Sequence, residues 1–387
     1  MVSLSPKLLR TTANGLKFKR AFTLPTDPLA RFKEISAATN EQPRVLITGA
    51  LGQLGRGLNS VYRYMYGDDC VVMTDIVKPP TECRRFLSLE FWISRNQSSS
   101  FKIWENVDVR DYRFVVDQGI DTIVHFSALL SAVGEQNVNL SLQINCRGVE
   151  NILEVARKHQ LKVFIPSTIG AFGPTTPRDN VPNCTIQAPT TIYGVSKVYA
   201  ERLGEYYHHK FGVDFRCLRF PGIISATKPG GGTTDYAIEI FYEALKKGRY
   251  TCYLYPDTKL PMMYDTDCMA SVIQFLSAPS ESLKHRTYNV TGFSFTPIDI
   301  ANAIKKILPH FEIDYSVCNV RQAIADSWPR SLDDSEAKRD WGWRVEYGLE
   351  ETVQVMLGLL QRDADKIVKA NTNPKQTADT FKALNKS

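Results

Sequence analysis

Hydrophobic residues in this chain alternate between short β-branched runs and longer stretches with helical spacing. The first run, 44–48, ends in glycines and is followed by a helical pattern over 54–66. The further predicted strands are 70–75, 122–126, 162–166, 214–220 and 288–290, and the further predicted helices are 140–159, 193–210, 267–277 and 298–307. Strands that alternate with helices in this way predict an α/β fold with a doubly wound parallel sheet.

The order of these elements divides the chain into four parts. Residues 43–225 carry the regular alternation and predict the Rossmann-type main domain, whereas 226–360 are less regular and predict a smaller C-terminal substrate lobe over the carboxyl edge of the sheet, with some elements returning to it. We expect 1–40 to be a leader and 361–387 a polar tail. The segment 84–105 is longer than expected and predicts a surface insertion.

Charge distinguishes the N-terminus from the rest of the chain. The net charge is +6, and the residues before Asp27 hold five basic side chains and no acid, which leaves about +1 for the remainder. A near-neutral body without a basic block excludes a nucleic-acid binder. An acid-free, Ser/Thr-containing basic segment is typical of a mitochondrial transit peptide, and a disordered basic extension is the alternative.

Two further function classes are not predicted. No stretch approaches the roughly 20 apolar residues that a membrane span requires, so we expect no membrane association. The eight cysteines are scattered and include no Cys-x-x-Cys pair. They predict reduced, mostly buried thiols and no metal site.

Glycines follow the first predicted strand at a spacing that suits a dinucleotide. Gly49, Gly52 and Gly55 permit a tight turn, close approach of the backbone to a pyrophosphate and close packing of the next helix, which Gln53 and Leu54 begin. An ordinary turn with a helix cap is the alternative interpretation.

Asp75 ends the second predicted strand and is followed by Ile76. A carboxylate there binds the ribose hydroxyls and repels a 2′-phosphate, so it predicts NAD rather than NADP. An ordinary loop aspartate is the alternative.

Tyr193 and Lys197 are four residues apart on a predicted helix, so their side chains share one face. A phenol titrates near pH 10 and becomes a useful base only when a cation stabilises the phenolate, which Lys197 is expected to do. Ser167 and Thr168 stand at the end of the strand predicted over 162–166. The combination predicts acid/base chemistry on a hydroxyl group.

These motifs resemble the extended short-chain dehydrogenase/reductase superfamily over roughly 43–360. The resemblance implies that Thr168, Tyr193 and Lys197 are catalytic, that Lys197 also bonds the nicotinamide ribose, and that the protein is a homodimer. It further implies a cofactor site that includes Asp108 and Val109 at the adenine, Phe126, Ser127, Ala128 and Leu129 along the pyrophosphate and ribose, and Asn145 and Ile223. We interpret His125 as a satisfied core histidine.

Four segments narrow the resemblance to the family of short-chain L-threonine 3-dehydrogenases: 129–135, 166–173, 219–225 and 230–237. That family implies oxidation of L-threonine to 2-amino-3-oxobutanoate, in mitochondrial breakdown of threonine towards glycine. Its substrate pocket implies roles for Ser131, Ser167, Thr168, Thr233, Thr234 and Asp235. Asp235 suits the ammonium group of an amino acid, although the Gly-rich loop before it is also typical of a plain connector.

Two alternatives use the same lobe. A sugar-nucleotide epimerase or dehydratase needs a nucleoside diphosphate pocket, for which Arg321 or Arg330 is available. A non-enzymatic NAD-binding scaffold predicts a degraded Tyr/Lys pair, whereas here the pair is intact.

Overall fold

A parallel sheet forms the centre of the computed structural model, which describes residues 30–37, 42–76, 119–227 and 232–372. Within these residues the strands follow the order β10-β6-β4-β3-β1-β2, with β5 beside β6, and all the neighbours are parallel. The strands are β1 (Val45–Thr48), β2 (Val71–Thr74), β3 (Thr122–His125), β4 (Lys162–Phe164), β5 (Ser167–Thr168), β6 (Phe215–Phe220) and β10 (Thr287–Asn289). The predicted parallel, doubly wound α/β fold is confirmed.

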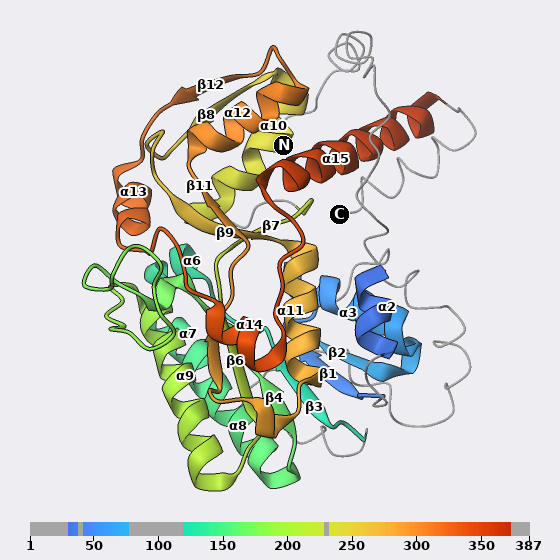
Figure 1. Cartoon of the computed structure of the whole chain (residues 1–387), viewed down its shortest axis with the longest axis vertical. Coiled ribbons are helices and arrows are strands. Elements are labelled where there is room, and N and C mark those ends of the chain that lie inside the picture. The colour runs from blue at the N-terminus through green and yellow to red at the C-terminus, as the bar shows by residue number, and fades with distance from the viewer. Residues whose placement is uncertain (1–29, 38–41, 77–118, 228–231, 373–387) are drawn as a thin grey trace.

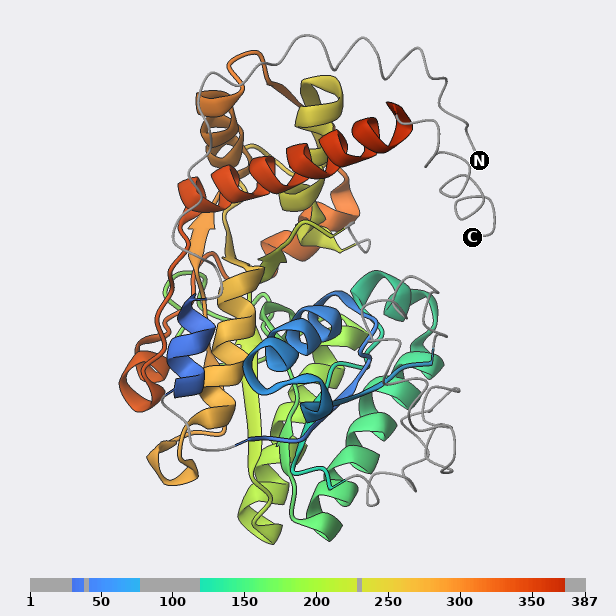
Figure 2. The same ribbon diagram turned by 90° about the vertical axis from the view of Figure 1, so that its right-hand side faces the viewer.

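Helices cover both faces of this sheet. Apolar side chains of α3 (Gln53–Tyr66) and α11 (Asp265–Ser277) pack on one face, and those of α8 (Gly148–His159) and α9 (Ile192–Phe211) on the other (Figures 1 and 2). The hydroxyl of Thr191 accepts a hydrogen bond from the N–H of Gly194 and so begins α9. Gly212, with φ +71°, ends it. These two caps set the position of the helix that carries Tyr193 and Lys197.

The smaller lobe continues directly from the main sheet. β7 (Gly222–Ile224) follows β6 after Pro221 and pairs with β9 (Leu260–Tyr264), which also pairs with β11 (Phe293–Phe295). The lobe therefore starts before the predicted boundary at 226, because Gly222 already pairs with Met262. Its other elements are β8 (Arg249–Cys252), β12 (Glu312–Tyr315), α10 (Tyr236–Lys247), α12 (Pro297–Ile307), α13 (Asn319–Asp326) and α15 (Leu349–Thr372).

Two elements connect the later part of the chain to the main domain. α11 packs against α3, and β10 pairs with β6 at the edge of the sheet. α14 (Ser335–Trp341) then lies beside β10. The returning elements join the two parts of the molecule around a shared edge.

Helix α2 (Ala30–Ala37) corrects the predicted leader, 1–40. It lies beside α3 and α11 (Figure 2), and its side chains Arg31 and Phe32 are 4% and 2% exposed. An apolar ring and an ion-paired guanidinium buried to this degree make residues 30–37 part of the folded body. The residues before Ala30 lie outside the described part of the chain.

The predicted helix 140–159 has three parts: α7 (Val138–Ser141), a π-helix termed η4 (Leu142–Arg147), and α8. The predicted tail also begins too early, because α15 continues to Thr372. The predicted insertion 84–105 lies outside the described residues. Among the helices that are described, none combines the length and apolar character needed to span a bilayer.

Candidate active site

The glycine loop between β1 and α3 forms a narrow backbone cradle at the carboxyl end of β1. Gly49 has φ +64°, and a Cβ atom there would lie 2.7 Å from the backbone nitrogen of Ser127. A Cβ at Gly55 would lie 2.6 Å from Cα of Ala50. Gly52, the N-cap of α3, makes no side-chain cap hydrogen bond. This cradle fits a diphosphate at a helix N-terminus.

Gln53 and Leu54 leave the cradle in different directions. The side-chain amide of Gln53 donates to the hydroxyl of Ser225, 2.7 Å away, and thereby joins the loop to the smaller lobe. Leu54 packs against the apolar cluster beneath the sheet. Their side chains therefore fix the loop, while its backbone remains available for a ligand.

Asp75 lies beside the glycine loop. The backbone N–H of Leu51 donates to its carboxylate over 2.9 Å, so the acid stands at the end of the cradle where the ribose assignment requires it. Ile76, which follows it, is exposed. Asp108 and Val109 lie outside the described residues.

Asn145 holds the segment Phe126–Leu129 that follows β3. Its side-chain oxygen accepts from the N–H of Leu129 at 2.8 Å, and its amide donates to the carbonyl of Leu129 at 3.0 Å and to the hydroxyl of Ser196 at 3.2 Å. The π-helix η4 places Asn145 where it reaches both partners. The contacts of Asn145 thus support the predicted cofactor-lining segment from behind.

Tyr193, Thr168 and Lys197 come together at the carboxyl edge of the sheet. The side chains of Thr168 and Tyr193 lie next to each other, because a Cβ atom at Gly170 would be 3.6 Å both from Oγ1 of Thr168 and from a ring carbon of Tyr193. Oγ1 of Thr168 accepts from the N–H of Gly170 at 3.1 Å. Nζ of Lys197 donates to the carbonyl of Pro166 at 2.8 Å and lies 5.5 Å from the centroid of the Tyr193 ring. The three predicted catalytic residues therefore share one site.

Burial dominates the acidity of this pair. Desolvation raises the pKa of Tyr193 to about 12, an effect that the neighbouring Thr168 partly offsets. Desolvation also lowers the pKa of Lys197 to about 8, against the opposing influence of Cys217 and Glu201. The predicted lowering of the phenol pKa by Lys197 is not seen, because Nζ faces the ring and donates to Pro166 instead of the hydroxyl.

His125 is buried at the end of β3. Its Nδ1 is 2.7 Å from the hydroxyl of Thr48, and its Nε2 has no hydrogen-bond partner among the described residues. Burial, with a smaller contribution from Lys197, lowers its pKa to about 3, so the ring is neutral. The interpretation as a satisfied core histidine therefore holds for one ring nitrogen only. The other is an unpaired polar atom close to the site.

The predicted substrate residues lie in three places. Ser131 begins α6 (Ser131–Gln136), which is held to the start of α9 because Glu135 accepts from the N–H of Ile192 at 2.7 Å. Ser167 is buried and donates its hydroxyl to Glu201. Ser167 therefore contacts the catalytic helix directly, and Ser131 lies on a helix that is attached to it.

Thr233, Thr234 and Asp235 form a short 3₁₀ turn, η6, in the smaller lobe. The carboxylate of Asp235 accepts from the N–H of Gly232 at 2.8 Å and so caps its own turn. Thr234 lies against β7, where a Cβ atom at Gly222 would be 3.0 Å from its methyl carbon. Ile223, predicted to contact the cofactor, is the next residue of that strand. Gly230 and Gly231 lie outside the described residues.

Sequence reasoning missed a buried ion pair behind the catalytic residues. Glu201 is fully buried on α9, and Arg219 of β6 donates to its two oxygens at 2.9 Å each. Gln187 donates to the same carboxylate at 2.8 Å. The sequence contains a pattern that could have revealed this acid: Glu201 follows Lys197 by four residues, as Lys197 follows Tyr193, so all three side chains share one face of the helix.

The two arginines considered for a nucleoside diphosphate have other contacts. The guanidinium of Arg321 stacks 4.1 Å from the ring centroid of Tyr253. Arg330 pairs with Asp179. These contacts do not favour the sugar-nucleotide alternative.

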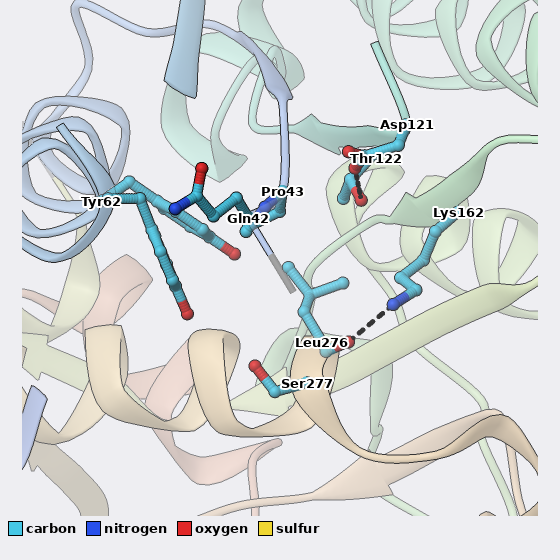
Figure 3. A pocket seen from close by; sticks show the side chains of 9 residues that line it. Gln42, Pro43, Tyr62, Asp121, Thr122, Lys162, Leu276 and Ser277 are labelled. Carbon is cyan, nitrogen blue, oxygen red and sulfur yellow. Dashed lines mark hydrogen bonds between the residues drawn. The ribbon is translucent and has the colours of Figure 1, made fainter. Parts of the chain in front are cut away.

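A separate cavity of about 350 Å³ lies at the opposite, amino edge of the sheet (Figure 3). Asp121 and Lys162 border it where β3 and β4 begin, and Lys162 donates to the carbonyl of Leu276 at 2.8 Å. In the part of the chain that the structure describes, no three His, Cys, Asp or Glu side chains gather as a metal site. Because the glycine loop, Thr168, Tyr193 and Lys197 all lie at the carboxyl edge of the sheet, that edge is the candidate site.

Comparison with known proteins agrees with this geometry. The model of the NAD dependent epimerase/dehydratase family matches residues 45–291, which include the glycine loop, Thr168, Tyr193 and Lys197. This chain belongs to that family.

Within the family, the chain is similar to threonine dehydrogenases. It is 52% identical to the mitochondrial L-threonine 3-dehydrogenase of Sus scrofa over 339 residues, or 86% of each chain. The crystal structure of L-threonine dehydrogenase from Phytophthora infestans matches with a TM-score of 0.76 and 48% identity, over 83% of this chain and 99% of that one. A monomeric L-threonine 3-dehydrogenase from a metagenome database matches with a TM-score of 0.73 and 34% identity, over 83% and 99%.

Proposed function

We propose that this protein is an NAD-dependent L-threonine 3-dehydrogenase that oxidises the side-chain hydroxyl of L-threonine to give L-2-amino-3-oxobutanoate. The observation that carries the proposal is the meeting of Tyr193, Thr168 and Lys197 beside the glycine cradle. The similarity to threonine dehydrogenases over most of the chain supports the choice of substrate.

NAD fits the residues of the cradle. The backbone around Gly49 and Gly55 leaves no room for a Cβ atom, and Asp75 stands beside it with an acid that suits free ribose hydroxyls. Nε2 of His125 adds an unpaired polar atom at the same edge. When bound there, NAD supplies the acceptor for the hydride that leaves C3 of the substrate.

The protein's own residues handle the proton. The side chains of Tyr193 and Thr168 are neighbours beside Gly170, so one substrate hydroxyl can contact both of their oxygens. Thr168 orients that hydroxyl, and the phenolate form of Tyr193 accepts its proton as the C3–H bond breaks. Lys197 donates to Pro166 in the structure; with NAD bound it would bond the nicotinamide ribose, and its ammonium group would then stabilise the phenolate.

The amino-acid part of the substrate is assigned to three groups of the site. Ser131 and Ser167 provide hydroxyls from the main domain, and the turn Thr233–Asp235 provides two hydroxyls and a carboxylate from the lobe. Asp235 is buried, and a buried carboxylate pairs strongly with an ammonium group. This assignment distinguishes an amino acid from a simple alcohol.

Tyr193→Phe tests the mechanism. The ring and its packing remain, so NAD affinity should be unchanged, while kcat with threonine should fall by about 10²- to 10⁴-fold. NADH formation by the wild type is measured with threonine, other hydroxy amino acids and UDP-sugars. Near-normal turnover by the variant would refute the role of the phenol, and activity on UDP-sugars alone would favour the epimerase or dehydratase alternative.

We also propose a homodimer formed through α9. Val195, Tyr199 and Tyr206 lie on one exposed face of this helix, and Leu142 of η4 is exposed beside it. Tyr206→Glu should produce monomers in size-exclusion chromatography with light scattering, whereas Val320→Glu on the exposed face of α13 should not. Because one relative is described as monomeric, a monomeric wild type is the outcome that contradicts this proposal.

We propose mitochondrial targeting by the segment before α2. Its basic composition, with no acidic residue before Asp27, and the mitochondrial relative support this location. A fluorescent reporter fused to residues 1–29 should enter mitochondria, and a purely cytosolic signal would count against it.

A further inference from the structure

The catalytic helix α9 is tied to the strand beneath it at two adjacent points. Lys197 donates to the carbonyl of Pro166 at 2.8 Å, and one helical turn later Glu201 accepts from the hydroxyl of Ser167. Thr168, the next residue, lies beside Tyr193, because a Cβ atom at Gly170 would be 3.6 Å from both side chains. Three successive residues, 166–168, thus lie against three successive turns of the helix.

Glu201 also connects this contact to the rest of the sheet. Arg219 binds both of its oxygens at 2.9 Å and donates to the carbonyl of Asn183 at 2.6 Å. In the sheet Arg219 is paired with Ser167 itself. Both members of the ion pair are buried, so solvent screens their interaction little.

We propose that Glu201 is a positioning residue for the reaction, which fixes Lys197 and Thr168 relative to each other and keeps Lys197 in its ammonium form. This inference rests on the proposed active site. Glu201 contacts neither the substrate hydroxyl nor the phenol, so it acts through its neighbours.

The charges around Lys197 support the second part of this role. Besides Tyr193, the titratable groups that face it are Glu201 on α9, Cys217 on β6 and His125 on β3. Burial raises the pKa of Cys217 and lowers that of His125 to about 3, so both are neutral near pH 7. Arg219, together with the bonds from Ser167 and Gln187, holds the pKa of Glu201 below its usual value. Glu201 is therefore the negative charge that favours the ammonium form.

Glu201→Gln tests the proposal and keeps the size of the side chain. Loss of the charge should lower kcat/KM for threonine by up to about 10²-fold through misplacement of the catalytic groups. Without the negative charge the pKa of Lys197 should fall, so the limb of the kcat/KM pH profile that reports this lysine should move to lower pH by about one unit. Glu205→Gln is the matched control, because Glu205 lies one turn further along α9 in a partly exposed pair with Arg202. The control should keep the wild-type pH profile.

Two more variants separate charge from folding. Glu201→Gln alone leaves the buried guanidinium of Arg219 unpaired, which is strongly destabilising, so Glu201→Gln/Arg219→Gln removes both charges. The double variant should fold and still show the displaced pH profile. Glu201→Asp retains the charge but shortens the reach to Ser167, and should lower kcat while keeping the wild-type profile. Wild-type turnover and a wild-type pH profile in the double variant would overturn the inference.

A readout without threonine separates this inference from the proposed function. Hydrogen exchange of the NAD-bound protein should be faster over 166–170 and 193–201 in the double variant than in wild type or Glu205→Gln. Unchanged exchange overturns the positioning role. A wild type that forms no NADH from threonine contradicts the proposed function instead, and the exchange result still decides the role of Glu201.

Discussion

Arg31 joins helix α2 to the folded body, and its replacement by alanine measures how much that helix contributes. Its guanidinium lies 2.5 Å from the carboxylate of Asp267 and donates to the carbonyl of Arg344 at 2.5 Å. It also stacks 5.5 Å from the ring centroid of Trp343. Asp267 is fully buried at the start of α11. The pair therefore joins α2, α11 and the segment before α15.

Arg31→Ala leaves the carboxylate of Asp267 buried without its cation. Loss of one partner of a buried ion pair costs roughly 3–5 kcal/mol of the free energy of unfolding. Asp267 keeps hydrogen bonds from the backbone N–H groups of Glu346 and Tyr347, at 3.1 and 3.0 Å, so we expect the lower end, about 3 kcal/mol. At about 2 °C for each kcal/mol, the Tm should fall by about 6 °C.

The loss should also depend on pH. Burial already raises the pKa of Asp267, while Arg31 acts in the opposite direction. Without Arg31 the folded protein binds the proton more tightly than the unfolded chain. Stability is then partly recovered as the pH falls through the raised pKa of this carboxyl, and is lowest above it.

Urea unfolding and differential scanning fluorimetry at pH 5 and pH 8 measure both effects. Arg344→Ala is the control, because this arginine is largely exposed in its pair with Glu34 and should cost less than about 1 kcal/mol. Equal losses for the two variants, or an Arg31→Ala protein within about 0.5 kcal/mol of wild type, would refute the reasoning.

The remaining predictions concern the cofactor and the packing of the catalytic helix. Asp75→Ala should weaken NAD binding and relax discrimination against NADP, and an unchanged preference in paired titrations would remove the ribose assignment. Gly204→Ala should destabilise the protein by about 1–3 kcal/mol in urea unfolding, because the added Cβ would lie 2.2 Å from the ring of Phe215. A neutral result would show that this ring can move aside.

Much of the main domain was predictable because its signals are local. The run 44–48, its glycines and the helix 54–66 lie next to one another in the sequence, and the structure has β1 and α3 there. The stretch 140–159 was predicted as one helix, because the helical spacing of its apolar residues does not reveal that a π-helix occupies Leu142–Arg147. The π-helix contains Asn145, whose contacts with Leu129 no local pattern shows.

The ends of the chain were less predictable for a related reason. Residues 30–37 carry little apolar patterning. Helix α2 is held in place by residues that are distant in the sequence, because Arg31 donates a hydrogen bond to Asp267 and stacks on the ring of Trp343. A composition-based leader therefore included a folded helix. The start of the smaller lobe was also misplaced, since Gly222 lies just beyond the strand predicted over 214–220 and its pairing with Met262 is not visible in the sequence.

The chemistry of the Tyr/Lys pair illustrates the limit most directly. Sequence reasoning starts from unperturbed groups, in which a lysine near a phenol favours the phenolate. In the folded protein, burial raises the pKa of Tyr193 to about 12 and lowers that of Lys197 to about 8, so both groups shift towards their neutral forms. The carboxylate of Glu201 opposes this shift for Lys197. A Tyr-x-x-x-Lys spacing predicts acid/base chemistry from unperturbed groups, whereas in this buried site the acid one turn further along the helix contributes a charge that favours the ammonium form of the lysine.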